Sequence, residues 1–365
     1  MRELTVPIGI VLLTAAACGR YDYDAAIPRP DPFRKPIHIR PPAGLSGDLF
    51  DFPVAIALVS DPDLAAHADP SGDGFHFTEP DGRTALAAEV ERYDPGTLAA
   101  WVRVPRLVVG QETLIYLAYG GAGPPGGPTD PEVWPGAAAV WHLTGDASGP
   151  GGDSGPDGHE LRAVTPATLP TSVPGLVGLA ADYDGVDDAL VGDDPPDGSL
   201  DFGTSTFSYS SWVHVEASVG LYDTPWHKGG SSSDTVGYDF ELGTDDWRAL
   251  ISDGVTLVTV PFGNEATFLG RWVHLVAVVD REALQFRLYA DGSLRAEMSL
   301  AGFGSVSTTW PATIGRDDAS WFRGAIDEVR VWRGAVSADW VRMEHANLAD
   351  PTAVVEVGAE EAVSP

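Results

Sequence analysis

Short apolar segments that end at Gly, Pro or Asp recur along most of the chain, and this pattern restricts the fold more than any other feature. Segments such as 207–215, 272–280 and 325–332 have the length of β-strands. The 42 Gly and 30 Pro among 365 residues supply the turns that many short strands need. The pattern therefore predicts an all-β protein, with one short helix at 337–342 that Ser337 can cap.

Changes in composition divide the chain into parts. Residues 19–32 are polar and rich in proline, and Gly120–Pro128 contains only Gly, Ala and Pro. The strand-length segments between these stretches predict a small β-sandwich, and those after the second predict a larger sandwich or jelly roll. We expect a signal peptide at 1–17, a Pro-rich tether at 18–32, a small β-domain at 33–123, a Gly/Pro linker at 124–133 and a jelly-roll domain at 134–360.

The N-terminal segment has the features of an export signal. An uncharged run from Leu4 to Ala17 ends in small residues directly before Cys18, the only cysteine in the chain. This run is shorter than the roughly 20 residues that a membrane-spanning helix needs. The arrangement resembles the lipobox of bacterial lipoproteins, in which the cysteine becomes the acylated N-terminus, although Ala15 stands where the family prefers Leu. The alternative is an ordinary secretory signal with an incidental cysteine.

The lipobox resemblance implies an exported protein that is attached to a membrane through its lipid anchor alone. Gly19 follows the cysteine, and this favours an outer-membrane or cell-surface location over retention at the inner membrane. The net charge of −31 excludes nucleic acid and anionic lipid as partners, because such a surface repels phosphate groups. The acidic residues are scattered through turns, where they either keep the protein soluble or bind Ca²⁺ through oxygen ligands.

Several phrases in the second half of the chain resemble LamG-like, concanavalin A-like jelly rolls in the order of that family. They are Val140–Leu143, Tyr183–Leu190, Phe207–Val213, the Trp-x-His strand Arg271–Val278, Leu288–Gly292 and Phe322–Trp332. The resemblance covers about residues 137–358 and implies a module that binds glycans or proteins, often with a structural calcium. Residues 33–123 resemble an uncharacterised bacterial β-domain that often precedes LamG-like modules. The carrying residues are Phe52–Val54, Asp73–Thr78, Asp81–Gly82 with Glu89 downstream, Trp101–Pro105 and Tyr116–Gly120.

Two sets of candidate binding residues follow. The resemblance implies a calcium site at Asp327 with the Asp184–Gly185 turn, and the alternative is that Asp327 caps a loop through backbone N–H groups. Aromatic residues in or near loops can stack on sugar rings, or they can anchor the loops by partial burial. These aromatic residues are Tyr222, Trp226, Tyr238, Trp310 and Trp321.

No catalytic set is visible in the sequence. The carboxylate pairs Asp239/Glu241 and Asp327/Glu328 do not match a sandwich glycosidase, since the first fits a solvated strand face and the second points to opposite faces. His274 belongs to the Trp-x-His strand and is expected to serve packing. We therefore expect no enzyme but a cell-envelope lipoprotein whose sandwich binds a glycan or an extracellular protein. A structural or docking component of the envelope is the alternative, and a polysaccharide-active enzyme is a more distant one.

Overall fold

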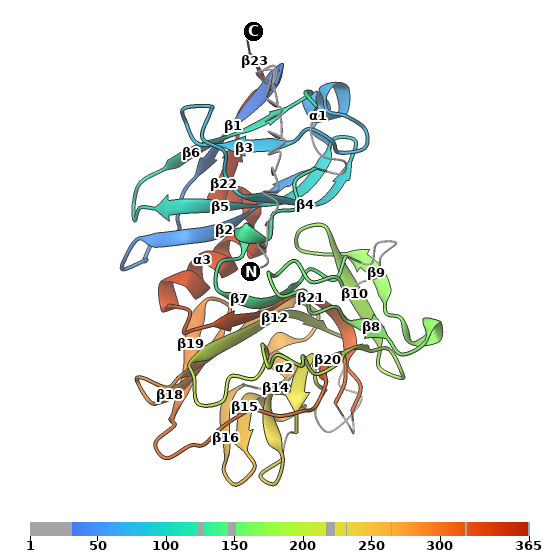
Figure 1. Cartoon of the computed structure of the whole chain (residues 1–365), viewed down its shortest axis with the longest axis vertical. Helices are drawn as coiled ribbons and strands as arrows, with labels where there is room; N and C mark the ends of the chain where they lie inside the picture. Colours follow the sequence, from blue (N-terminus) through green and yellow to red (C-terminus); the bar gives the residue numbers. More distant parts are fainter. Residues whose placement is uncertain are drawn as a thin grey trace, which may run out of the picture.

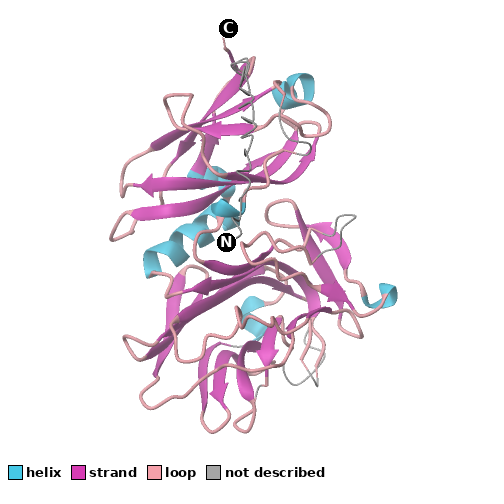
Figure 2. Cartoon of the chain, viewed as in Figure 1, coloured by secondary structure: helices cyan, strands magenta, loops and turns pink. Residues whose placement is uncertain are grey.

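The computed structural model describes residues 31–122, 127–144, 151–216, 223–230, 232–263, 265–317 and 320–363. The predicted signal peptide and Cys18 lie outside these residues. Two β-sandwiches follow one another along the long axis, and helix α3 (Ala338–Ala349) lies between them (Figure 1). Strands dominate both sandwiches (Figure 2), so the predicted all-β class is confirmed. Within the described ranges, none of the helices has the length and apolar character required to cross a bilayer.

The first sandwich consists of a five-stranded and a three-stranded antiparallel sheet. The five-stranded sheet contains β3 (His76–Thr78), β6 (Thr113–Tyr119), β1 (Phe33–Ile39), β22 (Val355–Val357) and β23 (Glu361–Ala362). The three-stranded sheet contains β2 (Leu49–Leu58), β5 (Thr97–Leu107) and β4 (Ala88–Asp94). Alternate residues such as Ile37, Ile39, Val54 and Ile56 point into the core between the sheets, as the two-residue period of a strand requires. Helix α1 (Pro62–His67) is capped by Asp61, whose side chain accepts the backbone N–H groups of Asp63 and Leu64.

The C-terminal segment belongs to the first sandwich and corrects the predicted domain boundary at residue 360. Strand β22 pairs with β1 from Ile37↔Val357 to Ile39↔Val355, and β23 pairs with the start of the same strand. Helix α4 (Pro351–Val354) and α3 contribute Val354 and Met343 to the same core. Strand β1 would otherwise present unpaired backbone groups at a sheet edge, and the C-terminal strands satisfy them.

The second sandwich is a jelly roll of an eight-stranded and a seven-stranded antiparallel sheet. The first contains β19 (Ser293–Ser299), β18 (Gln285–Ala290), β17 (Trp272–Asp280), β12 (Phe207–Val215), β21 (Arg323–Arg333), β10 (Leu179–Asp184), β9 (Thr171–Pro174) and β7 (Ala137–Trp141), which pairs with β21. The second contains β16 (Leu257–Gly263), β15 (Trp247–Asp253), β14 (Val236–Leu242), β13 (Trp226–Gly229), β20 (Ala312–Ile314), β11 (Leu190–Gly192) and β8 (Arg162–Ala163). Short helices η1 (Pro131–Val133), η2 (Pro166–Thr168) and α2 (Glu265–Phe268) complete the fold.

The two faces of the eight-stranded sheet have different neighbours. On β12, Phe207 and Tyr209 point into the jelly-roll core, whereas Trp212 joins a second buried cluster against the first sandwich. Trp101 of β5 and Trp332 of β21 belong to that second cluster too. The alternation of strand side chains therefore buries both faces of this sheet, and the two sandwiches share an apolar interface.

Helix α3 lies in this interface and confirms the predicted helix, although it extends seven residues beyond the predicted end at 342. The Ser337 hydroxyl accepts the backbone N–H of Trp340, as expected of an N-cap. Near its end, the Asn347 amide accepts the N–H of Ala55 at 2.8 Å and donates to the carbonyl of Ala55 at 3.1 Å. These buried bonds connect α3 directly to strand β2 of the first sandwich.

Candidate functional site

Trp310 is the predicted ligand residue that the structure places at an open pocket. It lies in the loop between β19 and β20, and 38% of its surface is exposed. The pocket has a volume of about 460 Å³ and lies where the start of β14 meets the loop before β20, two strands of the seven-stranded sheet. Its other lining residues are two acids, four residues with hydroxyl groups and one valine: Asp201, Asp234, Thr235, Val236, Ser307, Thr308 and Thr309.

A buried lysine fixes the shape of this pocket. The Lys228 ammonium group donates to the backbone carbonyls of Trp310 at 2.8 Å and Thr308 at 3.2 Å, and to Asp194 Oδ1 at 2.7 Å. Lys228 is fully buried, so these bonds replace its hydration shell. The Asp201 carboxylate also accepts the N–H of Thr308 at 3.1 Å. The loop that carries Trp310 is thus held by charge-assisted hydrogen bonds and does not need a ligand to order it.

The chemistry of this pocket suits a sugar. An exposed indole face can cover the apolar C–H surface of a pyranose ring, while neighbouring carboxylates and hydroxyls bind its hydroxyl groups. Hydrogen bonds from the Ser232 hydroxyl and from its own backbone lower the pKa of the Asp234 carboxyl group, and this favours its ionised form. The pocket therefore offers an aromatic platform beside a hydrogen-bond acceptor.

The predicted ligand roles of Trp226 and Tyr238 are wrong, because both side chains are fully buried in the jelly-roll core. Trp226 was expected in or near a loop, but it begins strand β13, which pairs with β14 and β20. The Trp226 ring packs 5.2 Å from the Trp141 ring, and the Tyr238 hydroxyl donates to a backbone carbonyl. Tyr222 lies outside the described residues.

Trp321 lies partly buried near the start of β21, with the guanidinium of Arg316 5.2 Å from its ring centroid. This contact fits the loop-anchoring alternative for Trp321. Within the described ranges, Trp310 is therefore the predicted aromatic ligand residue whose side chain is exposed and lines the pocket described above.

The predicted calcium ligands do not converge. Asp184 pairs with Arg323 on β21, and Asp327 is four residues further along that strand, which places it roughly 13 Å away. Asp327 is buried and accepts the N–H of Leu176 at 2.9 Å. Its pairing with the Asp184–Gly185 turn is therefore wrong. Asp184 instead lies with Asp187 and Asp188, and one carboxylate oxygen of each lies within 4.8 Å of the others. The predicted structural Ca²⁺ itself stays a prediction.

A dense group of ionisable side chains lies between the sandwiches, and no motif or spacing in the chain had indicated it. We call this group the interface cluster, and it consists of Glu89, Glu91, His142, Asp327, Glu328, Arg330 and Glu344. Irregularities in two strands, β4 and β21, direct the carboxylates of Glu91 and Glu328 into this cluster. On β4, Glu91 is an extra residue between Val90 and Arg92, which pair with neighbouring residues of β5. On β21, Glu328 lies in a bulge opposite β12 and has a φ of 51°.

The β21 bulge corrects the expectation that Asp327 and Glu328 point to opposite faces. In a regular strand neighbouring side chains alternate, but here Ile326 and Val329 fill the jelly-roll core and both carboxylates between them lie on the opposite face of the sheet. Glu328 accepts from His142 Nδ1 at 2.8 Å and pairs with Arg330, which also donates to Glu344 at 2.5 Å. The expected solvated face for Asp239/Glu241 is also wrong, since both are buried.

Indole groups enclose the interface cluster. The Arg330 guanidinium lies 4.5 Å from the Trp101 ring centroid and 4.8 Å from that of Trp134. Each indole N–H donates to a carboxylate of β4: Trp101 to Glu91 at 3.0 Å and Trp134 to Glu89 at 2.8 Å. Cation–π attraction and charge-assisted hydrogen bonds therefore act together at this contact.

Burial and neighbouring charges shift the pKa values of the interface cluster in different directions. Loss of hydration raises the pKa of Glu91 to about 8, and it raises the pKa of Asp327 well above its usual value. Burial opposes ionisation of Glu328 as well, but the nearby His142 and Arg330 hold its pKa below its usual value. Burial likewise disfavours the charged form of His142, but the carboxylates of Glu328 and Glu89 outweigh it and raise its pKa well above its usual value.

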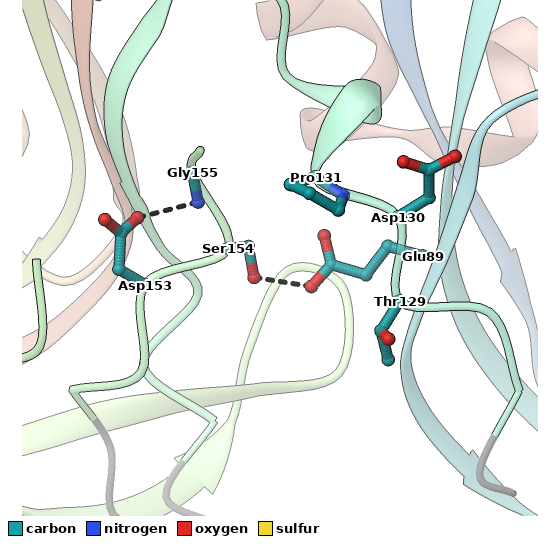
Figure 3. A pocket seen from close by; sticks show the side chains of 7 residues that line it. All are labelled: Glu89, Thr129, Asp130, Pro131, Asp153, Ser154 and Gly155. Carbon is teal, nitrogen blue, oxygen red and sulfur yellow. Dashed lines mark hydrogen bonds between the residues drawn. The ribbon is translucent and has the colours of Figure 1, made fainter. Parts of the chain in front are cut away.

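A polar pocket of about 310 Å³ opens next to the interface cluster (Figure 3). It is lined by Glu89, Thr129, Asp130, Pro131, Asp153, Ser154 and Gly155. Glu89 of the first sandwich points toward Ser154 of the jelly roll, and the Ser154 hydroxyl donates to Glu89 at 2.5 Å (Figure 3). The Asp153 carboxylate accepts three backbone N–H groups, from Val140, Gly155 and His159. Glu89 is thus the link between this pocket and His142, whose Nε2 is 3.6 Å from Glu89.

Comparison with known proteins identifies the second sandwich. Residues 188–342 match the Laminin_G_3 model, described as the concanavalin A-like lectin/glucanases superfamily. No curated protein matches the chain. The resemblance of residues 33–123 to an uncharacterised bacterial β-domain stays a prediction.

Several solved structures are similar to this chain. The binding domain of Paraclostridial Mosquitocidal Protein 1 is 14% identical, with 57% of this chain and 51% of that chain covered and a TM-score of 0.46. The botulinum neurotoxin serotype G binding domain is 11% identical, with coverages of 57% and 50% and a TM-score of 0.45. Domain 4 of AbnA, a GH43 extracellular arabinanase from Geobacillus stearothermophilus in complex with arabinotriose, is 20% identical, with coverages of 56% and 96% and a TM-score of 0.39.

The match spans about half the length of the toxin binding domains, and these likenesses concern the fold and carry no ligand over to this chain. The family match and the two-sheet architecture agree on the same region. Residues 188–342 thus match a model of concanavalin A-like proteins and lie within a two-sheet jelly roll.

Proposed function

We propose that the protein is an exported lipoprotein whose jelly roll binds a glycan at the Trp310 pocket. The observation that carries this proposal is the partly exposed Trp310 ring beside Asp234 and several hydroxyl groups, on a loop that Lys228 fixes in place. A fixed loop lowers the entropy that binding costs. We infer binding and not catalysis, because Asp201, the second acid of the pocket, is engaged with the backbone of Thr308.

Replacing Trp310 by alanine should abolish glycan binding and leave the fold intact. We expect at least a tenfold loss of affinity, equivalent to about 1.4 kcal/mol, because the stacking platform is removed. The measurement is a glycan array with the mature chain, followed by calorimetry on each hit. Phe50→Ala is the matched control, because Phe50 is an aromatic residue of the first sandwich with 61% exposure and lies outside this pocket.

Hits that survive Trp310→Ala would contradict the proposed site. Hits lost instead in Phe50→Ala would move the binding site to the groove near Trp332 and Trp340, which Phe50 lines. A blank array together with a co-purifying envelope protein would favour the second candidate function, a docking component of the envelope.

The proposal also includes a lipid anchor at Cys18 and an outer-membrane or cell-surface location. Its support is the uncharged run that ends in small residues directly before the single cysteine. Replacing Cys18 by serine should move the exported protein from the membrane fraction to the soluble fraction, because more than one acyl chain is needed for lasting attachment. Fractionation and immunoblotting measure this, and a variant that stays with the membrane would argue against the anchor.

A further inference from the structure

The interface cluster contains more buried acid than buried base. Five carboxylates, those of Glu89, Glu91, Asp327, Glu328 and Glu344, face one guanidinium and one imidazole. Burying an ionised carboxylate without compensation is costly, so such a group is normally paired, protonated or bound to a metal ion. An additional cation would therefore offset the excess negative charge of the cluster.

Three side chains of the cluster have the geometry of a metal site. One ligand atom each of Glu91, His142 and Glu328 lies within 4.8 Å of the others. Glu91 comes from the first sandwich, whereas His142 and Glu328 come from the jelly roll. Three buried polar atoms at this place have no hydrogen-bond partner within the described part of the chain: Glu91 Oε1, His142 Nε2 and Asp327 Oδ1.

Neighbouring groups orient the Glu91, His142 and Glu328 side chains through the second polar atom of each. Glu91 Oε2 accepts the Trp101 indole N–H, and Glu328 Oε2 pairs with Arg330. His142 directs Nε2 toward Glu89 at 3.6 Å, while Nδ1 faces Glu328 at 2.8 Å and Glu91 at 3.9 Å. Metal-binding histidines commonly have a carboxylate at the second ring nitrogen in this way.

The turn between β9 and β10 is shaped to admit the carboxylates. A Cβ at Gly178 would lie 2.0 Å from Glu91 Oε1, and a Cβ at Gly175 would lie 2.6 Å from Asp327 Oδ2. Only glycine at both positions lets the two acids approach the same point, and Gly178 also has a φ of 71°. Asp327 is held there by the N–H of Leu176.

We propose that the interface cluster binds one divalent transition-metal cation of the Zn²⁺ class, ligated by Glu91, His142 and Glu328, with Asp327 beside it. One imidazole among carboxylates suits Zn²⁺ better than Ca²⁺, which takes oxygen ligands. Because the ligands come from both sandwiches, the ion joins the two modules. The polar pocket of Figure 3 is lined by Glu89, whose carboxylate is 3.6 Å from His142 Nε2, and this pocket offers the ion an entry path.

The test uses the full mature chain after dialysis against EDTA. Addition of ZnCl₂ should raise the melting temperature of the protein. Titration calorimetry should show that one ion binds per chain. Glu91→Gln, which keeps the shape and removes the charge, should lower the affinity at least tenfold. Asp187→Asn is the matched control, because Asp187 belongs to the acidic turn at 184–188, and this variant should bind like the wild type.

Metal binding can also be measured by a spectroscopic signal that does not depend on the stability of the fold. Co²⁺ added to the stripped wild type should give visible d–d absorption that Zn²⁺ displaces. The proposal is overturned if the stripped wild type binds neither ion, or if binding survives in Glu91→Gln and is lost in Asp187→Asn. Stabilisation by lower pH alone, with no response to metal, would show that protons neutralise the cluster and would equally overturn it. None of these outcomes bears on glycan binding at Trp310, so the two proposals are tested independently.

Discussion

Replacing Arg330 by methionine should lower the free energy of unfolding by about 3–5 kcal/mol, because it leaves buried carboxylates without their cation. Arg330 is 1% exposed and pairs with Glu328 and Glu344. Methionine retains much of the volume and the contact with the indole rings, so the loss reports mainly on charge. Chemical denaturation monitored by tryptophan fluorescence measures the effect.

The deficit of Arg330→Met should shrink as the pH is lowered from 8 to 5. Burial already raises the pKa of Glu344 above its usual value, and loss of the guanidinium removes the attraction that opposes this rise, so the folded variant takes up protons that the unfolded chain does not. Such groups contribute stability at low pH and lose it as the pH rises. Arg162→Met is the control, since Arg162 pairs with Asp193 at the surface and should contribute less than about 1 kcal/mol at any pH. A deficit that does not change with pH would argue against uncompensated carboxylates as its cause.

Replacing Trp226 by alanine should destabilise the protein by about 3–5 kcal/mol through the cavity left in the jelly-roll core. Trp226 is fully buried and packs against Trp141 and Tyr238. The same change at Trp310 should cost less than about 1 kcal/mol, because its ring is partly exposed already. Thermal unfolding of the two variants side by side separates a core residue from a surface residue. Equal stability of both would contradict the burial of Trp226.

The sequence was sufficient for the fold class because strand-length alternation and turn residues are local signals. The phrases Phe207–Val213 and Arg271–Val278 lie in β12 and β17 as expected, and Ser337 caps α3. The pairing of the C-terminal strands with β1 was not predictable, since alternation indicates a strand and not its partner.

The same limit explains the failures at the candidate sites. Trp226 lies in a four-residue strand among turn residues, and this strand gave too little alternation to distinguish it from a loop. The bulges at Glu91 and Glu328 add one residue to a strand, so a strict period of two assigned Glu328 to the wrong face. His142 and Lys228 acquire their partners from segments far along the chain, and no spacing signals such contacts. Trp310 was predicted as a ligand residue from its aromatic character near a loop, and its pocket supports keeping it as a candidate.

The pairing of β22 with β1 makes the first sandwich a discontinuous domain that carries the jelly roll as an insertion. Strand β6 ends at Tyr119 and β22 begins at Val355, so about 235 residues separate the two neighbours of β1. At a synthesis rate of about 5–20 residues per second, the edge of β1 waits on the order of ten to fifty seconds for its partner to be made. The jelly roll can fold during that interval, whereas the sandwich nearest the proposed anchor closes last.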